Sequence, residues 1–102
     1  MMSLKPGVKA LGIRPEVILG LIVAEGCYQS FNVEMVVTSI ADSRHSLTSL
    51  HYTGCAVDLR TRTVLPEERQ ALCTLIASKL SNDYDVILEN DHIHLEFQPK
   101  RQ

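Results

Sequence analysis

Two short stretches with alternating side chains, far apart in the sequence, most constrain how this chain can fold. In residues 55–60, Asp58 falls within an apolar alternation, and residues 92–97 place His92 and His94 two positions apart. In an extended strand, residues i and i+2 point to the same face, so the two imidazoles share a face. A carboxylate with apolar strand neighbours needs a partner, and a metal ion supplies one. We therefore expect both stretches to be strands that meet at a metal site.

A third candidate ligand, His51, precedes Asp58 by seven residues, with Gly54 between them. A histidine, an aspartate and a second histidine that converge on one point form a three-ligand zinc site. This is the ligand count of catalytic zinc, because the fourth position stays open for water. The pattern therefore predicts a zinc site of the catalytic type.

The rest of the sequence predicts an α+β fold, with a small antiparallel sheet and two helices. Pro15 and Pro66 suit the first position of a helix, and each is followed by glutamate, which is favourable in a first turn. The helices are expected at residues 15–28 and from Pro66 to about Ser81. Residues 1–14 are expected to be an irregular lead, residues 40–53 a long polar loop and residues 98–102 a tail. The expected strands are residues 33–39, 55–60, 84–88 and 92–97.

Composition limits the classes of protein that this chain could be. Its 102 residues suit a single domain, and a net charge of −2 gives no electrostatic case for nucleic-acid binding. The apolar run at residues 17–24 is too short to span a membrane, and we expect no export signal. The three cysteines, far apart and odd in number, are expected to be small buried side chains in a protein of a reducing compartment. We expect a cytoplasmic monomer.

Residues 49–58 match in full the pattern S-x-H-x-x-G-x-A-x-D. This pattern resembles the signature of the zinc D-Ala-D-Ala carboxypeptidase and phage endolysin peptidase family. That family shares its fold with the signalling domain of hedgehog proteins, which the sequence resembles through residues 36–58 and again at Glu89 and His92-Ile93-His94. The resemblance covers residues 17–97 and is strongest to small phage and prophage proteins. It implies a hedgehog/DD-peptidase-like fold, a bacterial or phage origin, and a protein that stays in the cytoplasm until it is released to the cell wall.

The resemblance also implies roles for individual residues. It makes His51, Asp58 and His94 the zinc ligands, with the second histidine of the H-x-H pair binding the ion. His92 would lie beside the metal and donate to a substrate oxyanion. His45 matches a hedgehog position six residues ahead of the first ligand and would steady a substrate oxygen. Arg44 comes a few residues later than the peptidases' usual arginine, and it is equally interpretable as a solvated loop charge.

The catalytic carboxylate has two candidates. The family places an acid ahead of the last ligand, often by three residues, and Asp91 has that spacing to His94. If residues 90 and 91 form a two-residue hairpin turn, however, Glu89 faces His92 across the strands. Side-chain parity then places Glu89 on the metal face, and the hedgehog comparison agrees. Glu89 is the favoured general base and Asp91 the alternative.

The resemblance implies Zn²⁺ as the cofactor and a peptide bond of the peptidoglycan stem as the substrate. In that case the protein is a metallopeptidase of the carboxypeptidase or endolysin type. Two other classes stay open. One is a zinc-bearing module that uses the same site for recognition and not for hydrolysis, as the resemblance to hedgehog proteins suggests. The other is a phage structural protein that keeps the fold without the activity.

Overall fold

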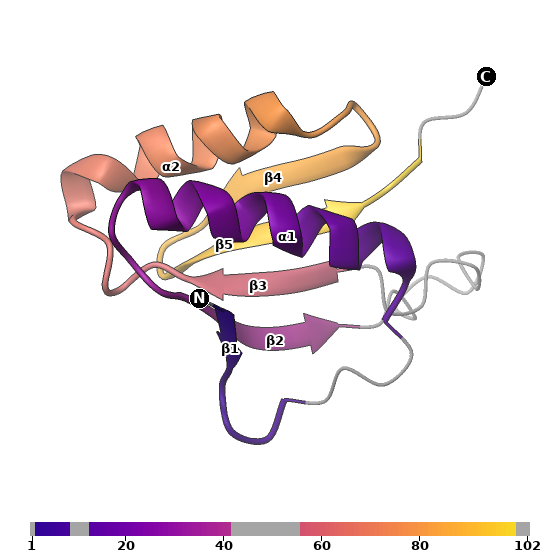
Figure 1. Ribbon diagram of the computed structural model, residues 1–102, viewed down its shortest axis with the longest axis horizontal. Coiled ribbons are helices and arrows are strands. Elements are labelled where there is room, and N and C mark those ends of the chain that lie inside the picture. Colours follow the sequence, from indigo (N-terminus) through magenta and orange to yellow (C-terminus); the bar gives the residue numbers. More distant parts are fainter. Residues whose placement is uncertain (1, 9–12, 42–55, 100–102) are drawn as a thin grey trace.

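A five-stranded sheet with two helices against one of its faces forms the fold (Figure 1). The structure is a computed structural model that describes residues 2–8, 13–41 and 56–99. Within these ranges the strand order is β1-β2-β3-β5-β4. The helices are α1 (Pro15–Ser30) and α2 (Pro66–Lys79), and the strands are β1 (Met2–Leu4), β2 (Met35–Ala41), β3 (Ala56–Arg60), β4 (Tyr84–Leu88) and β5 (His92–Phe97). The predicted α+β class is confirmed.

Both helices begin at the prolines that the sequence marks, and both place an apolar stripe on the sheet. Helix α1 packs against β2 and β5, helix α2 against β4, and the two helices contact one another. Helix α1 ends where Asn32 adopts a left-handed conformation (φ 60°), which asparagine tolerates better than most residues. The buried stripes are Val17, Leu21, Ala24 and Tyr28 in α1, and Leu72, Cys73 and Ile76 in α2.

The alternation in β3 and β5 separates their side chains onto two faces of the sheet. Asp58 pairs with His94, and Arg60 pairs with His92. Residues directly opposite in an antiparallel pair share a face, so these polar side chains lie together on the face away from the helices. The apolar residues that alternate with them are buried in the core beneath the helices: Val57, Leu59, Ile93 and Leu95.

The first residues of the chain depart from the prediction. Residues 2–4, expected within an irregular lead, form the edge strand β1, which runs parallel to β2 with Leu4 opposite Val37. The sheet is therefore mixed at this edge and antiparallel elsewhere. A three-residue edge strand has no periodicity of its own and depends on a distant partner, so local pattern could not reveal it. At the other end, Gln98, placed in the tail, donates its backbone N–H to the carbonyl of Asp83.

Two further expectations concern cysteines and membranes. Cys27 and Cys73 are buried, as predicted, whereas Cys55 lies outside the described residues. Neither α1 nor α2, the helices of the described ranges, is both long and apolar enough to cross a membrane.

Candidate metal centre

Asp58, His92 and His94 form a compact cluster on the open face of the sheet. One potential ligand atom from each residue lies within 4.8 Å of the others, which is close enough to hold a metal ion. Asp58 Oδ1 lies 3.0 Å from His94 Nδ1 and 3.5 Å from His92 Nε2. Each of the three side chains is a little over one quarter exposed, so the cluster is open on its outer side.

The register of two adjacent strands builds the cluster. Asp58 and His94 are directly opposed in β3 and β5, and His92 follows two positions along β5 on the same face. The strands are held rigidly because their other faces form the core. A site on paired central strands is positioned more exactly than one built on loops.

A second layer of carboxylates orients both histidines. The Nε2 atom of His94 lies 3.0 Å from Glu96 Oε1, and the Nδ1 atom of His92 lies 2.7 Å from Asp91 Oδ1. Metal-bound histidines commonly donate their other ring N–H to a carboxylate, which fixes the tautomer and makes the ligating nitrogen more basic. Each histidine thus has one nitrogen held from outside and one nitrogen directed at Asp58.

His94 carries the clearest electrostatic signature in the cluster. Burial lowers its pKa, but hydrogen bonds to Glu96 and Asp58 outweigh that cost, and the pKa is raised above the ordinary value of 6.5. Carboxylates at both ring nitrogens favour the doubly protonated imidazolium. A divalent cation in place of the proton between His94 and Asp58 would satisfy the same charges. The donor set therefore fits a metal ion.

The predicted hairpin is present, and it separates the two candidate bases. The backbone N–H of Glu89 donates to the carbonyl of His92 at 2.8 Å, which leaves residues 90 and 91 as the turn. Glu89 therefore lies opposite His92, on the face that carries the cluster. Asp91 is almost fully exposed, and its hydrogen bond to His92 lowers the pKa of its carboxyl group. Asp91 is thus engaged with the outer nitrogen of His92, while strand pairing places Glu89 on the face of the cluster.

Three residues that the resemblance assigned to the site, Arg44, His45 and His51, lie outside the described residues. The structure brings together Asp58, His92 and His94, whereas the sequence predicted His92 as a neighbour of the metal and His51 as a ligand. Sequence reasoning missed Glu96. A signal for it existed, because Glu96 follows His94 by two residues in the same strand and so shares its face.

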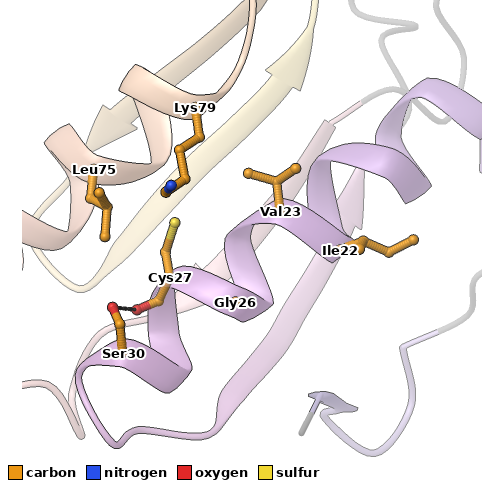
Figure 2. A pocket seen from close by; sticks show the side chains of 7 residues that line it. All are labelled: Ile22, Val23, Gly26, Cys27, Ser30, Leu75 and Lys79. Atoms are coloured by element: carbon orange, nitrogen blue, oxygen red, sulfur yellow. Dashed lines mark hydrogen bonds between the residues drawn. The ribbon is translucent and has the colours of Figure 1, made fainter.

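A hollow lies in the helical layer, between α1 and α2 (Figure 2). Figure 2 shows the Lys79 ammonium group and the Cys27 sulfur pointing toward one another. Burial raises the pKa of the Cys27 thiol although Lys79 opposes the shift, so the thiol is protonated at neutral pH. The Ser30 hydroxyl donates to the Cys27 carbonyl. This hollow presents no activated nucleophile among its described residues, and the candidate metal cluster lies on the opposite face of the sheet.

No protein-family model matches this chain, and neither a curated protein nor a solved structure does.

Proposed function

We propose that this protein is a zinc-dependent peptidase that hydrolyses a peptide bond of the peptidoglycan stem. The observation that carries the proposal is the cluster of Asp58, His92 and His94 on an open sheet face, with an outer carboxylate behind each histidine. The resemblance of residues 49–58 to zinc peptidases supplies the substrate class. A mixed set of histidine nitrogens and one carboxylate oxygen suits zinc.

The residues of the chain divide the reaction between them. A bound zinc ion would supply the nucleophile by lowering the pKa of water from 15.7 to about 7. Asp58 and His94 would hold the ion together with His51, which the resemblance assigns, and Glu96 would fix the ring of His94. Glu89, on the same face, would accept the proton from the attacking water and return it to the leaving amine. His92 is either a further ligand or the donor to the developing oxyanion, and Asp91 orients its ring in both cases.

Digestion of purified sacculi tests the function. The zinc-loaded protein should release peptide fragments that mass spectrometry identifies, and Asp58→Asn should abolish the release together with zinc binding. Glu67→Gln, an exposed change in the first turn of α2, is the matched control and should retain both. Full zinc occupancy with no released amine would support the recognition module instead. Absence of stoichiometric zinc would favour the structural protein.

Zinc content of two single variants decides whether His92 is a ligand. If His94→Ala loses zinc and His92→Ala retains it, His92 is the oxyanion donor. Loss of zinc in both variants makes both histidines ligands, as the geometry of the cluster allows. Retention of zinc in His94→Ala would contradict the proposed centre.

A further inference from the structure

A hollow of about 440 Å³ adjoins the metal cluster, and its charged lining is unusual for this chain. Asp58 and His92 of the cluster line it, as do Thr38 and Asp91. Lys5, Arg60 and Arg62 also line it. The volume is within the range of small-molecule sites. Since the whole chain has a net charge of −2, three cationic side chains in one hollow do not reflect a basic composition.

The sheet topology gathers these cations from two distant parts of the chain. Arg60 pairs with His92 across β3 and β5, two residues beyond Asp58 on the same face. Arg62 follows in the turn after β3. Lys5 comes directly after β1, and its backbone N–H donates to the Val37 carbonyl, which fixes it beside β2. The edge strand that local pattern could not predict therefore brings Lys5 to the hollow.

The described residues do not neutralise the positive charge in the hollow. Among the described residues, the side chains of Lys5, Arg60 and Arg62 form no ion pair within 4.0 Å and no hydrogen bond. The two carboxylates of the lining are already engaged with imidazoles, Asp58 with His94 and Asp91 with His92. A metal ion in the cluster would make the hollow more positive still. The hollow is therefore built for an anion.

We propose that this hollow is an anion subsite that binds a carboxylate of the peptide substrate close to the bond that is cut. The inference rests on the proposed function for the identity of the ligand. Guanidinium groups bind carboxylates through two parallel N–H···O bonds, so a pair of arginines suits this anion. Residues two apart in a strand are separated by about 6.6 Å, which is roughly the length of two peptide residues. The bound carboxylate is thus the C-terminus or an acidic side chain within one or two residues of the reacting carbonyl.

Binding to the metal-free protein tests the subsite without reference to activity. The probes are N-acetyl-Lys-D-Ala-D-Ala, its C-terminal amide, and an amidated peptide of equal length that contains one glutamate. The free acid should shift the NMR signals of the Arg60 and Arg62 guanidinium N–H groups, and the plain amide should not. If the glutamate peptide shifts them equally or more, the ligand is a side-chain carboxylate. Equal binding of the plain amide, or shifts confined to other residues, would overturn the subsite.

Charge removal provides the second arm. Arg60→Gln with Arg62→Gln should weaken binding of the acidic peptide roughly tenfold or more, because charge-assisted hydrogen bonds are lost. Arg60→Lys in place of Arg60→Gln should restore part of the affinity. The control is Lys79→Gln, which removes a cation from the hollow in the helical layer and should leave the affinity unchanged. Unaltered binding in the double variant contradicts the subsite.

Kinetics separates failure of the subsite from failure of the proposed function. In the zinc-loaded protein, the double variant should raise KM with a smaller change in kcat and an unchanged zinc content. If the acidic peptide binds through both arginines but is never hydrolysed, the subsite stands and the peptidase is wrong. If the double variant hydrolyses acid and amide with wild-type KM values, the peptidase stands and the subsite is wrong.

Discussion

His94 takes part both in the central strand pairing and in the candidate metal cluster. Its backbone continues the central pairing of β3 with β5, while its ring contacts Asp58 through one nitrogen and Glu96 through the other. In the metal-free protein these contacts favour a protonated ring, and a metal ion requires a deprotonated one. Proton and metal therefore compete for the same nitrogen.

This competition gives the stability a defined pH dependence. The pKa of His94 in the folded chain is raised above its unfolded value of about 6.5, so its stabilisation is complete below that pH and is lost as pH rises through the folded pKa. The thermal midpoint of the metal-free protein should fall across this window. The extra stability from added zinc should instead increase across this window, because zinc then has to displace fewer protons from His94.

Thermal unfolding at a series of pH values, with and without zinc, measures both trends. Glu96→Gln is the informative variant, because it removes a hydrogen bond that raises the pKa of His94 while retaining the shape of the side chain. It should move the window to lower pH and weaken zinc binding by roughly 10–100-fold, as loss of an outer-layer partner does. An unchanged window in this variant would contradict the assigned cause.

At the scale of elements, the sequence predicts what depends on local periodicity and misses what depends on distant pairing. Residues 84–88 and 92–97 are strands at the predicted bounds, and α1 and α2 begin where predicted, because alternation and helix-start prolines are local signals. Strand β1 exists only through β2. Strand alternation alone predicted which face of its own strand each of Asp58, His92 and His94 would occupy. The register that opposes Asp58 to His94 needed the whole sheet.

The β4–β5 hairpin carries a prediction about the catalytic carboxylate. Glu89→Gln should leave fold and zinc content unchanged but reduce turnover by about 10²–10⁴-fold, the usual contribution of a positioned general base. Asp91→Asn is the matched control. It removes the charge that faces the outer nitrogen of His92 and should slow the reaction far less. Steady-state hydrolysis of a peptidoglycan peptide compares the two. If Asp91→Asn abolishes turnover while Glu89→Gln barely changes it, the three-residue spacing identifies the base and strand parity does not.

Helix α1 contains two glycines that should respond to alanine in opposite ways. An added Cβ at Gly26 meets nothing within 4 Å, so Gly26→Ala should raise the free energy of unfolding by roughly 0.5–1 kcal/mol through helix propensity. At Gly20 the Cβ would lie 3.2 Å from the Tyr84 ring and 3.3 Å from a methyl group of Leu95. The Tyr84 hydroxyl donates to the Glu16 carbonyl, which limits how far the ring can yield.

The packing cost at Gly20 should therefore exceed the gain in propensity, with a net loss of about 1 kcal/mol, since overpacking typically costs about 1–3 kcal/mol. Urea unfolding of both variants measures the difference. A stabilised Gly20→Ala would mean that the contact between α1, β4 and β5 yields more easily than its hydrogen bond suggests.

At the scale of the whole molecule, one face of the sheet forms the core and the other carries the candidate metal cluster. The helices bury the apolar side of the sheet, and the cluster, its outer carboxylates and the cationic hollow all lie on the opposite side. The core includes no member of the cluster. Unlike a zinc finger, whose fold forms only with its metal, this chain should keep its fold when the metal is removed.

Chelation tests this separation. Zinc at 100 times its dissociation constant stabilises a protein by about 2.7 kcal/mol, and a domain of this size shifts its thermal midpoint by about 4–8 °C per kcal/mol. Removing the metal should therefore lower the midpoint by roughly 10–20 °C while the far-UV circular dichroism at 25 °C stays unchanged. Asp58→Asn should show no shift with either zinc or chelator, because it lacks the carboxylate that contacts both histidines. Complete unfolding on chelation would show that the core is insufficient alone. An equal shift in Asp58→Asn would place the bound zinc away from the cluster.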